Sequence, residues 1–428
     1  MKKIFDSPFA YTALLWLLLP YVIFHLLWRG RKQPEYLKHI SERFGFYAIK
    51  ADKPVIWLHT VSVGETRAAA SLINRLAECY PNHQLLLTHT TPTGRATGEQ
   101  LYGNRVMRVY LPYDYPFAVR RFLQHFQPHT GILLETEIWF NLIHHCHLRQ
   151  MPLLLLNARL SRKSSARYAL FPQLTRLGLL ELNAIAAQTE ADAKRLRFLG
   201  GENISLMGNL KFDIEPSAAM LELGKRLRMS FGADRNIFLA ASTREGEEAL
   251  ILAALKEISI PNLLSVIVPR HPQRFDEVAA LIEREGFRYQ RRSRDESIQA
   301  DTQVVLGDSM GEMFAYYTAC DLTFIGGSLL PFGGQNLIEA CSVGKPVLIG
   351  PHTYNFAQAS LLAIKCGAAR RVADARELTQ ALQELFSSPE QIQTMATAGL
   401  HFVSANQGAT ERALAQVSMA LTQAESGN

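Results

Sequence analysis

Acidic side chains stand directly after short apolar runs at two places in the chain. Residues 55–58 form one run, and the loop HTVSVGE that follows them ends in Glu65. Residues 132–134 form another, which leads into Glu135 and Glu137. Carboxyl groups in such positions can share a proton, hold a hydroxyl group or take its proton. Acids favoured by a helix N-terminus produce the same pattern, so position alone leaves their role open.

A glycine-rich stretch in the second half of the chain suits the binding of an anion. The apolar residues 322–325 precede Gly326 and Gly327, and the segment GGQNLIEACSVGKP then leads to another apolar run at 347–349. Glycines let backbone N–H groups approach an anion, and the following helix presents its positive end there. Glu339, in the first turns of that helix, can accept hydrogen bonds from ribose hydroxyls. An ordinary glycine-rich turn with a solvated glutamate has the same appearance.

Apolar runs alternate with helical patterns along the chain, which predicts an α/β protein with parallel sheets covered on both faces. We expect a membrane anchor at 1–32, a Rossmann-like acceptor-binding and catalytic domain at 33–212, and a Rossmann-like nucleotide-sugar domain at 213–428. The last helix could pack back on the N-terminal domain. Because the polar loops follow strands in both halves, we expect them to meet at a central cleft.

Composition limits the class of protein. The chain has 428 residues, of which 48% are hydrophobic and 20% charged, as in folded proteins rather than disordered ones. A net charge of +6 suits an anionic partner, which by charge alone can be nucleic acid, a phospholipid headgroup or a phosphorylated substrate. The five cysteines are scattered, which favours reduced thiols in a cytosolic environment.

The N-terminal segment is long and apolar enough for a membrane helix. Residues 9–28 read FAYTALLWLLLPYVIFHLLW and carry no formal charge, and the basic sequence RGRK follows them. This flank favours a cytoplasmic position for the rest of the chain. A helix that lies in the membrane interface or docks on the protein has the same composition, so spanning stays open. Residues 35–44 predict a short amphipathic helix after it.

Several motifs together resemble those of GT-B type glycosyltransferases, and most closely the 3-deoxy-D-manno-octulosonic acid (Kdo) transferases, which act on lipid A precursors. They occur in the family's order along nearly the whole chain: HTVSVGE, ETEIW, NARLS, GNLK, PRHPQR, GDSMGEM and GGQNLIEA. The chain departs from the family at Gln335, where histidine is usual, at Leu337, where proline is frequent, and at Phe140, where proline is usual.

The resemblance implies roles for particular residues. It makes Glu65 the base, Glu135 a transition-state partner and Lys211 a fixed cation. It assigns the CMP-sugar to Pro269, Arg270, Gly311, Glu312, Met313, Asn336, Leu337, Ile338 and Glu339. Possible contacts to the acceptor or sugar are Ser62, Gly64, Thr93 and Arg95. No DxD-type acidic pair accompanies the donor motifs, so we expect neither a metal nor another cofactor.

The implied function is an inverting transfer of Kdo from CMP-Kdo to the tetraacyl lipid A precursor, at the cytoplasmic face of a bacterial inner membrane. The partners are then the donor, the lipid acceptor and membrane lipids, without nucleic acid. A GT-B transferase that uses a UDP-sugar on another lipid is an alternative. A nucleotide-sugar isomerase of similar double-Rossmann fold is another, although it would not need the segment at 9–28.

Overall fold

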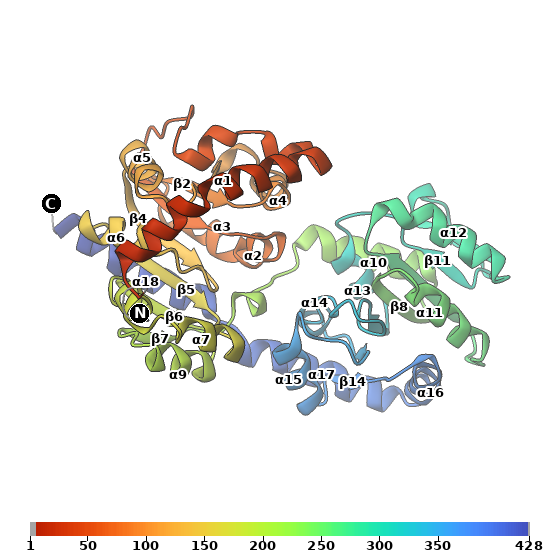
Figure 1. Ribbon diagram of the computed structural model, residues 1–428. Helices are drawn as coiled ribbons and strands as arrows, with labels where there is room; N and C mark the ends of the chain where they lie inside the picture. Colours follow the sequence, from red (N-terminus) through yellow and green to blue (C-terminus); the bar gives the residue numbers. More distant parts are fainter. Residues whose placement is uncertain (1–5, 427–428) are drawn as a thin grey trace. The chain divides into compact units, whose positions relative to one another are not determined.

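The computed structural model describes residues 6–426 and divides into two compact units. Unit 1 comprises Met1–Asp213 together with Gln407–Asn428, and unit 2 comprises Ile214–Asn406. Each unit has one parallel seven-stranded sheet with helices on its faces (Figure 1).

The sheet of unit 1 has the order β3-β2-β1-β4-β5-β6-β7, with every pair parallel. The strands read as short continuous apolar runs because helices cover the sheet on both sides. They are β1 (Val55–His59), β2 (Gln84–His89), β3 (Met107–Tyr110), β4 (Pro128–Leu134), β5 (Leu153–Ala158), β6 (Ala184–Ala187) and β7 (Ile204–Leu206).

Helices and single turns connect the strands of unit 1. The α-helices are α1 (Pro8–Lys32), α2 (Val63–Ala68), α3 (Ala70–Cys79), α4 (Pro92–Tyr102), α5 (Pro116–Phe126), α6 (Phe140–Leu148), α7 (Arg162–Tyr168), α8 (Pro172–Leu180), α9 (Glu190–Phe198) and α18 (Ala409–Ser426). The 3₁₀ turns are η1 (Pro34–Leu37), η2 (Ile40–Phe44), η3 (Gly103–Arg105) and η4 (Leu210–Phe212).

The C-terminal helix α18 belongs to unit 1. Its side chains Ala413 and Val417 are fully buried in the same hydrophobic cluster as Ile56 of β1. Asp213 holds the start of the helix by accepting hydrogen bonds from the N–H groups of Gly408 (2.7 Å) and Thr410. The chain therefore returns to the first sheet after completing the second.

Helix α1 contacts the rest of unit 1 through polar side chains. The Tyr11 hydroxyl donates to Asp114 (2.8 Å), and the Thr12 hydroxyl donates to the Asn141 side-chain oxygen (2.8 Å). The Tyr115 hydroxyl donates to the backbone carbonyl of Leu15 (2.8 Å). One side of this apolar helix is thus in contact with protein.

The expected helix at residues 35–44 is wrong, because the segment forms η1 and η2 instead. His39 separates the two turns with a left-handed φ of 55°, which no α-helix accommodates. Glu42 and Arg43 of η2 are buried, so tertiary contacts of charged side chains decide the path here.

The sheet of unit 2 has the order β10-β11-β9-β8-β12-β13-β14 and is also parallel throughout. Its strands are β8 (Asn236–Thr243), β9 (Leu263–Pro269), β10 (Tyr289–Arg291), β11 (Val304–Leu306), β12 (Leu322–Ile325), β13 (Val347–Ile349) and β14 (Ala369–Arg371). Its helices are α10 (Ala218–Phe231), α11 (Glu247–Lys256), α12 (Phe275–Arg284), α13 (Met313–Ala319), α14 (Ile338–Ser342), α15 (Ala357–Lys365), α16 (Ala375–Phe386) and α17 (Pro389–Asn406), with the 3₁₀ turns η5 (Pro272–Arg274) and η6 (Arg292–Arg294).

Candidate functional site

The polar loops of unit 1 meet where the order of its strands reverses. Successive strands are added on one side of β1 up to β3, and β4 then begins the other side. Parallel α/β sheets bind their ligands at the carboxyl ends of strands beside such a reversal. The loop with Glu65 follows β1, and the loop with Glu135 follows β4, so both acids lie there.

Glu65 is the third residue of α2 and is held in place by two donors. The backbone N–H of Val61 donates to Oε2 (2.7 Å), and the Ser62 hydroxyl donates to Oε1 (2.9 Å). Ser62 is also the N-cap of the helix. Burial raises the pKa of Glu65, the hydrogen bonds oppose this shift, and nearby Glu135 adds to it. A raised pKa brings the proton affinity of a carboxylate closer to that which a general base needs.

Glu135 and Lys211 lie beside Glu65. Lys211 Nζ is 3.9 Å from Glu135 Oε1, and about a fifth of each side chain is exposed. The charge of Lys211 lowers the pKa of Glu65, although burial has the larger, opposite effect. Glu135 has a left-handed φ of 61°, a conformation that costs energy for a residue with a side chain. The structure therefore brings the three predicted catalytic residues together.

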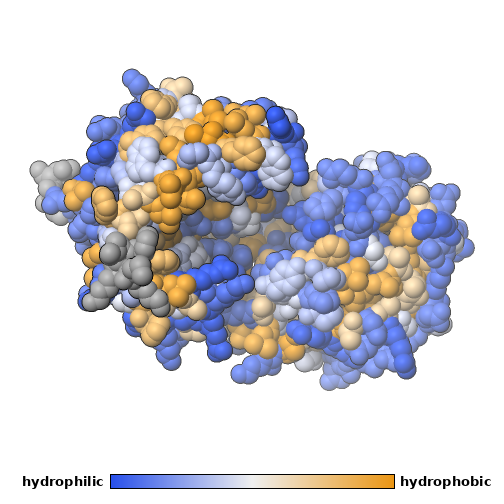
Figure 2. Space-filling view, viewed as in Figure 1, coloured by the Kyte–Doolittle hydropathy of each residue, from blue (hydrophilic) through white to orange (hydrophobic). Residues whose placement is uncertain are grey.

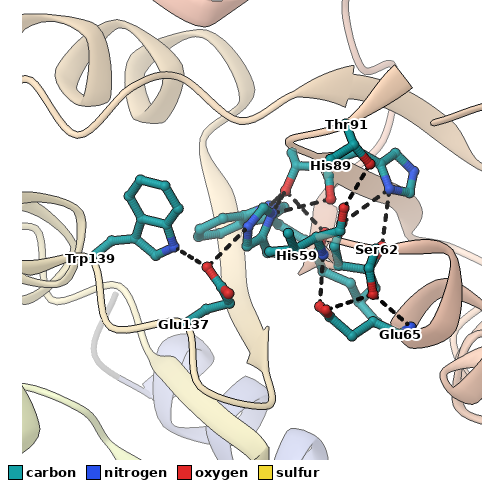
Figure 3. A network of polar contacts seen from close by, with 12 residues as sticks. His59, Ser62, Glu65, His89, Thr91, Glu137 and Trp139 are labelled. Atoms are coloured by element: carbon teal, nitrogen blue, oxygen red, sulfur yellow. Dashed lines mark hydrogen bonds and ion pairs between the residues drawn. The ribbon is translucent and has the colours of Figure 1, made fainter. Parts of the chain in front are cut away.

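Sequence reasoning placed Glu137 beside Glu135 but gave no separate role to Glu137 or to its neighbours His59 and Trp139. Glu137 accepts a hydrogen bond from the Trp139 indole N–H (2.7 Å) and lies 3.9 Å from Nε2 of His59 (Figure 3). Burial raises the pKa of Glu137 to about 7 and lowers the pKa of His59 to about 3. His59 Nδ1 lies 2.9 Å from the Thr88 hydroxyl and 3.1 Å from the Thr88 carbonyl, and Nε2 is the ring nitrogen directed towards Glu137.

The predicted acceptor contacts of unit 1 differ in their surroundings. Gly64 and Thr93 are exposed, at the starts of α2 and α4. The Arg95 guanidinium instead forms a two-pronged contact with Glu42, at 2.5 and 3.4 Å. The charge of Arg95 is therefore already balanced within unit 1, and its contact with an acceptor stays a prediction.

In unit 2 the order of the strands also reverses, between β8 and β12. The glycine-rich loop follows β12 and so lies beside this reversal. A Cβ on Gly326 would lie 2.5 Å from the Ser242 carbonyl oxygen, so this glycine permits close backbone packing. The N–H of Gly327 donates to Glu247 (2.6 Å), a buried acid of α11. We predicted that these glycines would turn their N–H groups to an anion, but the N–H of Gly327 is engaged within the protein.

The two arginines of the motif PRHPQR have different surroundings. Pro269 ends β9, and the Arg270 backbone N–H is tied to the Thr243 carbonyl (3.0 Å), which fixes the loop beside the reversal of strand order. Arg274 binds buried Glu248 with two hydrogen bonds, at 2.7 and 3.1 Å. The second arginine of the motif thus stabilises the loop.

The remaining predicted donor residues lie on two loops of unit 2. Gly311, Glu312 and Met313 precede or begin α13, and the Ser309 hydroxyl donates to Glu312 (2.6 Å). The other loop carries Asn336, Leu337, Ile338 and Glu339 into α14. The Asn336 amide donates to Glu339 (3.1 Å), which orients this carboxylate. Within residues 6–426, no group of three or more His, Cys, Asp or Glu side chains could hold a metal ion.

Comparisons with known proteins agree on a family. Residues 38–214 match the family model described as 3-Deoxy-D-manno-octulosonic-acid transferase (kdotransferase). The chain is 37% identical to the 3-deoxy-D-manno-octulosonic acid transferase of Haemophilus influenzae, covering 95% of this chain and 97% of that protein. It is 41% identical to the enzyme of the same name from Bordetella pertussis, covering 87% and 89% of the two chains.

Solved structures bear on the fold alone. The UDP-GlcNAc 2-epimerase of Neisseria meningitidis bound to UDP-GlcNAc superposes with a TM-score of 0.59 at 15% identity, covering 86% of this chain and 100% of that one. Together with the two parallel sheets, this confirms the prediction of a GT-B type fold with two Rossmann-like domains. Identity this low says nothing about the reaction, so the resemblance to an epimerase does not favour the isomerase alternative.

Proposed function

The chain belongs to the 3-deoxy-D-manno-octulosonic acid transferase family of glycosyltransferases, and we propose that it moves Kdo from CMP-Kdo to the tetraacyl lipid A precursor in lipopolysaccharide biosynthesis. The observation that carries the proposal is Glu65, a half-buried carboxylate oriented by two donors beside Glu135 and Lys211. Support for the reaction class comes from relatives that cover almost the whole chain.

In this reaction Glu65 takes the proton of an acceptor hydroxyl. The oxygen attacks the anomeric carbon of Kdo, the bond from that carbon to the phosphate oxygen breaks, and CMP leaves with the bonding electrons. One displacement inverts the anomeric configuration. Lys211 can balance the negative charge of the sugar carboxylate or the departing phosphate, while Glu135 holds Lys211 in place.

We further propose that unit 2 binds CMP through Pro269, Arg270 and residues 311–313 and 336–339. Glu339 is suited to the ribose hydroxyls, because Asn336 orients its carboxylate at the start of α14. Arg270 is suited to a phosphate, which a guanidinium can bind with two parallel hydrogen bonds.

Helix α1 would hold the enzyme at the membrane surface. It is long and apolar enough to cross a membrane, and only 6% of its most apolar stretch of 18 residues is buried. Figure 2 shows hydrophobic side chains gathered over this helix. Its residues Phe9, Leu17 and Phe24 are 83%, 77% and 66% exposed. Since its other side contacts unit 1, we propose that α1 lies in the cytoplasmic leaflet of the inner membrane.

The test is mass spectrometry of the lipid product after incubation with CMP-Kdo, the tetraacyl lipid A precursor and EDTA. A gain of one or more Kdo units supports the donor, acceptor and metal independence together. Glu65→Gln should lower turnover about 10²- to 10⁴-fold and leave CMP binding unchanged. Glu78→Gln, the same change at an exposed acid of α3, is the matched control. Transfer of a UDP-sugar in place of Kdo would refute the proposal.

A further inference from the structure

Unit 1 contains a second polar feature near Glu65 that the proposed catalytic roles do not use. A cavity of about 300 Å³ lies between α1, the turns η1 and η2, and the loops after β2 and β3. Its walls include two arginines, Arg29 and Arg43, as well as apolar and aromatic side chains such as Leu26, Leu111 and Trp139.

Arg43 is a buried cation with unused donors. It is 3% exposed, and its Nη1 donates to the Thr90 carbonyl (3.1 Å) while the guanidinium stacks on Tyr110 at 4.0 Å. Within the part of the chain that the structure describes, its Nε and Nη2 have no hydrogen-bond partner. Burial of a charge is costly unless an opposite charge and hydrogen bonds compensate it.

The neighbouring Arg95 shows what Arg43 lacks. Both guanidiniums stack on Tyr110, at 4.0 Å for Arg43 and 4.9 Å for Arg95. Glu42 binds Arg95 with both oxygens, whereas no acid among residues 6–426 forms an ion pair with Arg43. An anion from outside the chain would supply the missing charge and the missing acceptors.

The cavity also fixes the kind of anion. Leu26, Leu111 and Trp139 offer contact to an apolar group attached to it, and Arg29 adds a second, exposed cation. Helix α1 forms one wall, so a ligand seated here also borders the surface that we assign to the membrane. These features together select a phosphorylated lipid rather than a free, fully hydrated anion.

The cavity is linked directly to the proposed base. Thr91 lines it and donates from its hydroxyl to the Val61 carbonyl (3.0 Å), and the Val61 N–H donates to Glu65 (2.7 Å). Two hydrogen bonds, through Thr91 and Val61, therefore connect the wall of the cavity with the carboxylate that takes the acceptor proton.

We propose that Arg43 binds a phosphate group of the lipid acceptor inside this cavity, with Arg29 at its exposed side. This assignment deepens the proposed function and rests on it for the identity of the acceptor. Arg43 then acts as a specificity residue: it selects phosphorylated acceptors and positions them beside Glu65.

The experiment compares two acceptors in the full-length enzyme: the tetraacyl precursor with both phosphates, and the same lipid after enzymatic dephosphorylation. Arg43→Met should lower kcat/KM for the phosphorylated lipid about 10- to 100-fold, the value of a hydrogen-bonded buried charge. It should leave kcat/KM for the dephosphorylated lipid close to wild type. Arg43→Lys keeps the charge and should recover part of the loss.

Two controls separate binding from folding. Arg121→Met removes a cation that also stacks on aromatic rings, at 4.1 Å from Phe46, but does not line the cavity. It should not distinguish the two acceptors. If Arg43→Met does not fold, Arg29→Met, at an exposed position, should still show a loss confined to the phosphorylated lipid.

An equal loss for both acceptors, or no loss for either, would overturn the proposal and make Arg43 a structural residue. Sedimentation with phosphatidylcholine vesicles that contain the precursor measures binding without CMP-Kdo. Binding that depends on Arg43 without any Kdo transfer by wild type would refute the proposed function alone. If Arg43→Met weakens binding to vesicles that contain phosphatidic acid just as much, the cavity binds general headgroups and the acceptor assignment is wrong.

Discussion

Replacing Ser62 by alanine should shift the pH dependence of transfer towards higher pH. The Ser62 hydroxyl donates to Oε1 of Glu65 at 2.9 Å and so stabilises the ionised carboxylate. Without this donor, burial of Glu65 is opposed by fewer hydrogen bonds, and its pKa rises further above its usual value. The base must be ionised to accept a proton, so activity falls as the pH drops through this pKa. The acidic limb of the profile therefore moves upwards.

The size of the shift follows from one hydrogen bond. A hydrogen bond to a charged group contributes about 1.5–3 kcal/mol, and one pKa unit corresponds to about 1.4 kcal/mol. Glu65 is only half-buried, so water can replace part of the lost donor. We expect a shift of about 0.5–1 pH unit, with the Val61 N–H still orienting the carboxylate.

The assay is kcat/KM for Kdo transfer between pH 5 and 9, for wild type and Ser62→Ala. Ser161→Ala is the matched control, because Ser161 caps α7 in the same way but contacts no proposed catalytic acid. Both variants should lose about 1 kcal/mol of stability from the missing cap. An acidic limb that stays in place in Ser62→Ala, or that moves equally in Ser161→Ala, would refute the role of Glu65 as base.

Other perturbations test the supporting structure. Arg274→Met leaves fully buried Glu248 without its partner, and urea titration should show a loss of about 3–5 kcal/mol. Gly350→Ala places a Cβ 2.2 Å from the Ser328 carbonyl oxygen, so the free energy of unfolding should fall by about 1–3 kcal/mol. The melting temperature should fall with it, and CMP should bind more weakly in calorimetry. Lys211→Met should lower kcat about 100-fold in the product assay while CMP binding is retained.

Much of the fold could be predicted because buried parallel strands have a simple signature. The run at 322–325 is β12, and the run at 55–58 is β1 with one further residue. Because helices cover both faces of the sheet, such strands are continuously apolar. The local sequence alone therefore identifies both of them, without knowledge of the strands they pair with. The segment at 35–44 failed for the opposite reason. Its path depends on Glu42 and Arg43 entering the interior to meet side chains far away in sequence.

The candidate site could be predicted only in part for the same reason. Glu65 and Glu135 stand at strand ends, a position that sequence makes visible. His59 is the last residue of an apolar strand. From sequence alone, a histidine there that faces a carboxyl group cannot be distinguished from one whose hydrogen bonds are all made within the core. Arg43 was even less visible, since exposed and buried arginines have the same local sequence context and only the three-dimensional structure shows the unused donors.

The two units show how one position can serve either chemistry or structure. Glu65 follows β1, Glu247 follows β8, and each lies in the first turn of the next helix. Glu247 is fully buried and accepts from four backbone N–H groups, which occupies the four lone-pair sites of a carboxylate. Glu65 accepts from two donors and is partly exposed, so it retains lone pairs for an incoming proton. The number of donors around each carboxylate, rather than its place in the motif, therefore separates the proposed base from the acid that shapes a loop.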